Sequence, residues 1–258
     1  MIHMFSFIIV LLLLTFSTSS CGHNVQDSMM SLNSSTSVSY DELYFEFEMD
    51  VGDGVNSFFI VMQNLEDDYD FGFVTEAPLR ITIYKFNDRE NIHQTIETHT
   101  FGSLFKDLTV GDFNFDGYND FSFVSFRENA NYFRDFWLWD SETQEFVFNA
   151  SLSELSMPNY DSQLKTVSGY WRNSAAEFIY AHYRYIDGEL LCIRLLEQRY
   201  QPDGGYLLSF VLDYRDGELV EVFRARFPID RNSNDDNIND SESYDDFLKW
   251  ENLLYFGE

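Results

Sequence analysis

The chain contains the run Leu108-Thr-Val-Gly-Asp-Phe-Asn-Phe-Asp-Gly-Tyr-Asn-Asp-Phe-Ser-Phe-Val-Ser-Phe126. Its middle, Asp112 to Asp120, places oxygen-bearing side chains at positions 1, 3, 5 and 9 and a glycine at position 6. A hard cation such as Ca²⁺ takes about six to eight oxygen ligands, which a short loop supplies by aiming alternate side chains inward and adding a backbone carbonyl. The spacing therefore predicts a calcium loop.

The predicted ligands are the backbone carbonyl of Tyr118 and the side chains of Asp112, Asn114, Asp116 and Asp120. Gly117 stands where the chain must turn sharply and a Cβ would obstruct the turn. An EF-hand would need a glutamate at position 12 and an exiting helix, whereas Phe123 occupies that position. We therefore expect a structural Ca²⁺ site between two strands, with an affinity of about 10⁻⁴ to 10⁻³ M. An ion-free turn rich in Asp and Asn is the alternative.

The residues on both sides of this loop predict β-strands. They are rich in β-branched and aromatic types, and similar short runs broken by Asp, Asn and Gly extend from Tyr44 to Phe227. Asp187-Gly188 and Asp216-Gly217 stand between such runs and indicate tight hairpins. We predict an all-β, β-propeller-like domain over residues 44–229, with about five small blades, and a β-sandwich as the alternative.

The N-terminal part predicts export. Residues 1–20 contain no Asp, Glu, Lys or Arg, and Phe5 to Leu14 is apolar apart from Ser6, as in a signal peptide. Ser19-Ser20-Cys21-Gly22 resembles a bacterial lipoprotein cleavage site, so we expect a lipid on Cys21 and a flexible tether over residues 21–43. The predicted location is extracytoplasmic and membrane-anchored, in the periplasm or on the cell surface; secretion without a lipid is the alternative.

The C-terminal part, residues 230–258, predicts an acidic linker followed by a short helix. Phe247, Trp250 and Leu254 would share one face of that helix. We expect the helix to dock on the domain, and a partner-binding tail is the alternative.

The net charge and the absence of catalytic motifs exclude several classes of function. The formal net charge of −28 repels nucleic acid and anionic lipid headgroups and favours basic proteins. Nucleophile-elbow, Walker and Cys-x-x-Cys motifs are absent from the sequence, and Cys192 lies in an apolar run as a small core residue would. We therefore expect a non-catalytic protein, with a glycosidase that uses a pair of carboxylates as a weaker alternative.

From Leu108 to about Tyr200 the sequence resembles a family of bacterial periplasmic calcium-binding β-propeller lipoproteins, which includes an immunity protein that inhibits a lysozyme-like secreted toxin. The matching stretches are Val110 to Phe121, Trp137-Leu-Trp-Asp140, Thr143-Gln-Glu-Phe-Val147, Leu152-Ser-Glu-Leu-Ser156 and Tyr183-Arg-Tyr-Ile-Asp-Gly-Glu-Leu190. The resemblance implies an extracytoplasmic propeller whose Ca²⁺ ligands are the five residues named above. It does not by itself transfer lysozyme inhibition, because that family's inhibitory residues have no counterpart placed on this chain. Together with the acidic charge, it motivates the hypothesis of a binding protein, such as an inhibitor or immunity protein against a basic lysozyme-like peptidoglycan hydrolase. A surface adhesion or scaffold module with structural calcium is the alternative.

Overall fold

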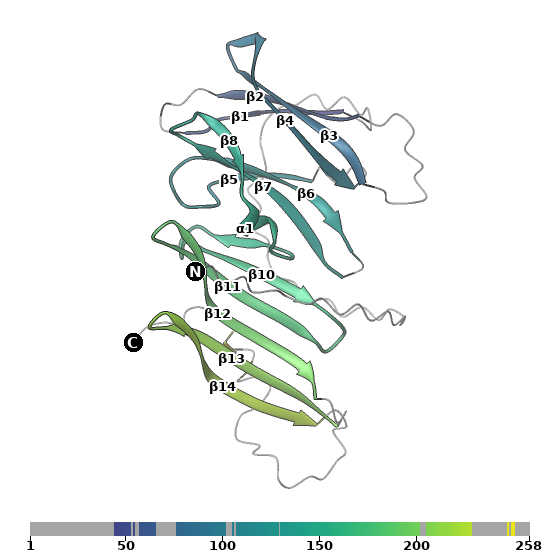
Figure 1. Ribbon diagram of the computed structural model, residues 1–258, viewed down its shortest axis with the longest axis vertical. Coiled ribbons are helices and arrows are strands. Elements are labelled where there is room, and N and C mark those ends of the chain that lie inside the picture. The colour runs from purple at the N-terminus through teal and green to yellow at the C-terminus, as the bar shows by residue number, and fades with distance from the viewer. Residues whose placement is uncertain are drawn as a thin grey trace, which may run out of the picture. The chain divides into compact units, whose positions relative to one another are not determined.

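A computed structural model describes residues 44–52, 54, 57–65, 76–101, 105, 107–128, 130–201, 205–228, 247, 249 and 250 (Figure 1). These residues form fourteen strands and one four-residue helix, and the strands make three antiparallel sheets. The predicted all-β class is confirmed. The signal peptide, the Cys21 tether, Leu254 and the linker predicted after residue 229 lie outside the described residues. Within the described part, no helix is long and apolar enough to cross a membrane.

The first sheet has the strand order β1-β2-β3-β4. Its strands are β1 Tyr44–Met49, β2 Phe58–Asn64, β3 Glu76–Lys85 and β4 Asp88–Phe101. Buried and more exposed residues alternate along β2 and β3, so one face buries its side chains completely, as at Ile60, Met62 and Ile81. This face shares one core with Phe121, Phe123, Trp139 and Phe146 of the second sheet.

The second sheet has the order β5-β6-β7-β8. Its strands are β5 Leu108–Gly111, β6 Asp120–Arg127, β7 Tyr132–Asp140 and β8 Glu145–Phe148. A second core contains Phe136 and Leu138 of β7 together with Leu152 of helix α1, Ala150–Ser153. Neighbouring residues of β7 therefore serve different cores, as the two-residue period of a strand requires.

The third sheet has the order β14-β13-β12-β11-β10-β9. Its strands are β9 Asn159–Asp161, β10 Thr166–Arg172, β11 Phe178–Ile186, β12 Glu189–Tyr200, β13 Tyr206–Arg215 and β14 Glu218–Pro228. Asp187 and Gly188 have φ of 52° and 84°, and Asp216 and Gly217 have φ of 50° and 95°. Positive φ at both central residues is typical of type I′ hairpin turns. The two Asp-Gly hairpins thus belong to one six-stranded sheet.

Two aromatic residues from the C-terminal part pack on this third sheet. Phe247 is fully buried, with its ring centroid 6.0 Å from that of Phe223 and 6.2 Å from that of Phe178. The N–H of Trp250 donates to the carbonyl of Phe247 at 3.1 Å, which closes one turn of chain. Arg194, which is 1% exposed, lies beneath the Trp250 ring at 4.8 Å from its centroid.

Candidate metal centre

The predicted calcium loop connects β5 to β6. Gly111 and Asp120 are paired across the two strands, so residues 112–119 form the end of a hairpin. Gly117 has φ of 97°, the left-handed conformation that suits glycine at this turn. Phe113 points the other way into the second core, with its ring centroid 5.0 Å from that of Phe136. The oxygen-bearing residues and the apolar residues of the loop therefore alternate, as the sequence predicts.

Asp120 is the innermost of the predicted ligands and is 0% exposed. Its Oδ2 accepts a hydrogen bond from the Phe113 N–H at 2.8 Å, and its Oδ1 accepts one from the Trp139 N–H at 2.9 Å. Burial raises the pKa of this carboxyl to about 8; the two hydrogen bonds oppose the rise, and the charges of Asp116 and Asp112 add to it. No Lys, Arg or His among the described residues forms an ion pair with it.

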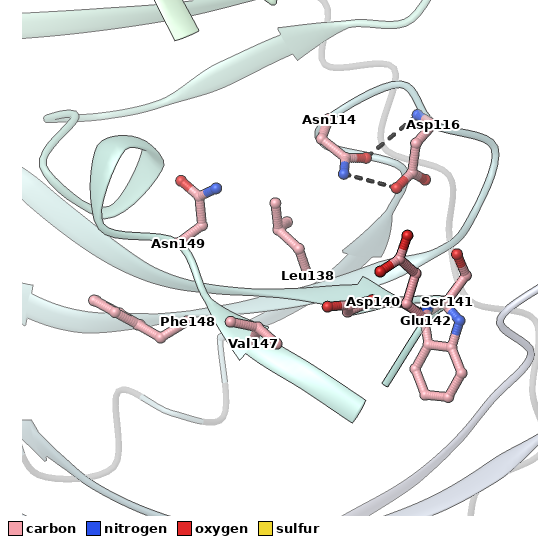
Figure 2. A pocket seen from close by; sticks show the side chains of 10 residues that line it. Asn114, Asp116, Leu138, Asp140, Ser141, Glu142, Val147, Phe148 and Asn149 are labelled. Atoms are coloured by element: carbon pink, nitrogen blue, oxygen red, sulfur yellow. Dashed lines mark hydrogen bonds between the residues drawn. The ribbon is translucent and has the colours of Figure 1, made fainter. Parts of the chain in front are cut away.

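The other side chains of the loop bind backbone N–H groups. Asp112 accepts from the N–H of Asp116 at 3.0 Å and from that of Gly117 at 2.9 Å. Asn114 donates to Asp116 Oδ2 at 2.8 Å and accepts from the Asp116 N–H at 3.3 Å, as Figure 2 shows. Asp116 in turn accepts from the Tyr118 N–H at 2.9 Å. Over the described residues, no three His, Cys, Asp or Glu side chains converge as a metal-ligand set does.

The loop also joins the first and second sheets. The backbone N–H of Asn119 donates to the carbonyl of Val51 at 2.8 Å, and its side-chain amide donates to the carbonyl of Asp50 at 2.9 Å. Gly52 has φ of 98°, and a Cβ added there would lie 3.5 Å from the carbonyl oxygen of Gly117. The segment after β1 therefore rests directly against the loop.

Tyr185 of β11 lies near the carboxylates of Asp116 and Asp120, a position that no sequence motif predicts. Burial raises the pKa of its hydroxyl to about 12, and the charges of Asp120 and Asp116 contribute to the rise. The hydroxyl oxygen is buried, and although Asn149 is beside it, the two do not meet in hydrogen-bond geometry. The third sheet thus contributes a buried polar group close to the loop.

A hollow of about 420 Å³ opens beside the loop (Figure 2). Asn114 and Asp116 of the loop line it together with Asp140, Glu142, Val147 and Phe148 from the ends of β7 and β8 and the turn between them. Val147 is 49% exposed and Phe148 is 44% exposed. Val147 pairs with Leu138 and Phe148 pairs with Trp137, so the side chains of these two residues leave opposite faces of the sheet.

The fold and the loop define the class: an all-β protein of three antiparallel sheets with a candidate metal loop between two strands. No protein-family model matches the chain, and no curated protein matches it. A solved structure of a Xanthomonas type IV secretion system related protein is similar, with 16% sequence identity and a TM-score of 0.48 over 69% of this chain and 93% of that chain.

Proposed function

We propose that the protein is a calcium-stabilised, non-catalytic binding protein that acts outside the cytoplasm, anchored by a lipid on Cys21. Asp120 is the observation that carries the calcium part of the proposal. Its carboxyl is fully buried, it stands near two further carboxylates, and no basic side chain of the described residues is paired with it. An ionised carboxyl in such a place is costly without a positive charge, which a cation in the loop would supply.

The donor set of the loop fits Ca²⁺ in chemistry. All five proposed ligands present oxygen: the side chains of Asp112, Asn114, Asp116 and Asp120 and the carbonyl of Tyr118. Oxygen-only donors favour hard cations over Zn²⁺ or Cu²⁺, which prefer nitrogen and sulfur. Binding would require the carboxylates to turn from backbone N–H groups toward a shared ion. Because the loop joins two sheets, the ion would act as a structural clamp.

The proposed partner is a basic protein, such as a lysozyme-like peptidoglycan hydrolase. The formal charge of −28 supports this, since a strongly acidic protein attracts a cationic partner over long range and speeds its association. The resemblance of residues 108–200 to a family with a lysozyme-inhibiting member points to the same class of partner.

Thermal unfolding with calcium and with chelator tests the clamp. Through mass action at millimolar Ca²⁺, a site of weak extracellular affinity adds on the order of 1 kcal/mol, or about 2 to 4 °C in midpoint. We expect Asp116→Asn to abolish this shift in midpoint. Glu90→Gln, at an exposed position of β4, should leave the shift unchanged. Identical midpoints for the unsubstituted protein with and without calcium would refute the clamp.

Two further measurements test the rest of the proposal. A lysozyme-type basic enzyme should lyse peptidoglycan more slowly as the protein is added; unchanged lysis by every such enzyme, with binding to envelope proteins or glycans instead, would favour an adhesion or scaffold module. Mass spectrometry of the N-terminal peptide from membranes should show a diacylglyceryl group on Cys21. An unmodified N-terminus beyond residue 21 would refute the anchor.

A further inference from the structure

We infer that Tyr185 of β11 is a positioning residue of the proposed calcium site: with the ion in the loop, its hydroxyl donates a hydrogen bond to a carboxylate ligand and holds that carboxylate toward the ion. The inference rests on the proposed function and extends it, because it adds the third sheet to the clamp. Ca²⁺ takes carboxylates, carbonyl oxygens and waters, so the hydroxyl acts through a ligand and not on the ion itself.

The packing around Tyr185 places it beside the loop. Tyr183 stands two residues earlier on the same face of β11, and Leu190 pairs with Tyr185 across β12. Both of these neighbours pack against the second core. From the loop, Phe113 is buried in that core and Phe115 packs against it. Tyr185 therefore lies among residues that contact the same core as the loop does.

The Tyr185 hydroxyl is a buried polar group that makes no hydrogen bond within the described part of the chain. Asn149 lies beside it, in the wall of the hollow that Asp116 also lines (Figure 2). The Asn149 Oδ1 already accepts the Leu152 N–H at 2.9 Å, and its Nδ2 can only donate. The hydroxyl proton therefore needs another acceptor, because a buried donor without one is costly. The carboxylates of Asp120 and Asp116 are close enough for their charges to act on this hydroxyl.

The loop carboxylates can accept this hydrogen bond and bind an ion at the same time. Asp120 accepts two backbone N–H groups, and Asp116 accepts one together with the Asn114 side chain. A carboxylate that turns from these donors toward a cation still has free lone pairs, since it has about four in all. A neighbouring donor then fixes its orientation, and such partners are typically worth about 10- to 100-fold in metal affinity.

Tyr185→Phe tests the inference, because it removes the hydroxyl and keeps the ring that packs beside the loop. Calcium chloride is titrated into the purified protein at constant ionic strength, and the amide chemical shifts of residues 111–120 are followed by NMR. We expect the Kd for calcium to rise about tenfold or more. The urea midpoint without calcium should not fall, because the hydroxyl that is lost had no hydrogen-bond partner among the described residues.

The matched control is Tyr183→Phe. Tyr183 is on the same strand and the same face, and its hydroxyl lies near Cys192 and Glu154. This control should change the Kd for calcium less than about twofold. Hydrogen exchange gives a second measurement: calcium should slow exchange of the amides of residues 183–186 in the unsubstituted protein and in Tyr183→Phe. Tyr185→Phe should lack this slowing even at saturating calcium, because the hydroxyl is the link between the ion and β11.

The outcomes separate this inference from the proposed function. If the unsubstituted protein binds calcium in the loop and Tyr185→Phe binds it with the same Kd, the inference is wrong. An equal loss of stability in Tyr185→Phe with and without calcium would also overturn it, because the hydroxyl would then serve the fold and not the ion. If calcium shifts no amide of residues 111–120 in the unsubstituted protein, the proposed calcium site is refuted, and the inference with it.

Discussion

The Asp120→Asn substitution removes one ionisable group from the interior and keeps its size and one acceptor oxygen. Without calcium, the pKa of Asp120 in the folded protein is about 8, against an ordinary value of 3.8. The folded state therefore holds a proton where the unfolded state has lost it. The resulting stability is fully present below the unfolded pKa and is lost as pH rises through the folded pKa. At about 1.4 kcal/mol per pKa unit, the loss amounts to about 4 kcal/mol between pH 4 and pH 7.

If Ca²⁺ binds in the loop as proposed, it should reverse this loss, because the ion would bind the ionised carboxylate and compete with the proton. We expect the stabilisation of the unsubstituted protein by calcium to grow from pH 5 to pH 8, whereas Asp120→Asn shows neither the calcium response nor this part of the pH slope. Urea denaturation followed by tryptophan fluorescence, with calcium-free and calcium-containing samples, measures both effects.

The matched control for this substitution is Asp161→Asn, because Asp161 accepts backbone N–H groups in an exposed turn. The control should retain the pH slope and the calcium response of the unsubstituted protein. If Asp120→Asn has the same slope and the same response as the unsubstituted protein, Asp120 neither titrates in the folded state nor binds the ion.

Two further substitutions and one chemical reaction test the packing of the sheets. Asp213→Asn breaks the two-bond ion pair with Arg194, which is 1% exposed, and should lower the free energy of unfolding by about 3 to 5 kcal/mol in urea; a loss below about 1 kcal/mol would contradict the buried pair. Gln94→Ala should cost about 1 to 3 kcal/mol and speed hydrogen exchange of the Phe146 amide, and unchanged exchange would contradict the bonds to β8. Burial raises the pKa of the Cys192 thiol to about 11, so iodoacetamide should react slowly at pH 8 and quickly in urea; fast reaction of the folded protein would show an accessible thiolate.

Local patterns in the sequence predicted the strands well. The predicted strand-like runs begin at Tyr44, which is also the first residue of β1, and the Asp-Gly pairs at 187–188 and 216–217 form the expected hairpins. The arrangement of the strands into sheets was harder to predict from the sequence, because it depends on contacts between strands that are distant in the chain. The sequence suggested about five small blades, whereas the described strands gather in three sheets, one of them six-stranded.

The loop spacing predicted which residues come together, but not what surrounds them. Nothing local to Asp120 indicates that the Trp139 N–H binds it or that Tyr185 lies close by. Arg134 shows the reverse: its run Tyr132-Phe133-Arg134 has residue types found at interfaces, yet Arg134 is only 8% exposed and donates to the Ser122 hydroxyl and to the backbone carbonyl of Asp107. Such roles depend on tertiary contacts that a single sequence does not encode at short range.

Two buried carboxylates show why the cation is expected at one place and not at another. Asp213 is 5% exposed, and Arg194 meets it with two hydrogen bonds of 2.6 and 2.9 Å, so the chain itself provides the compensating charge. Asp120 is buried still more completely, yet it receives only two backbone N–H groups, and the charged groups near it are also carboxylates. A buried carboxyl in this position either keeps a proton or acquires a cation from outside the chain. Our proposal requires the second state at neutral pH when calcium is present, and the ion would then hold the contact between the first two sheets.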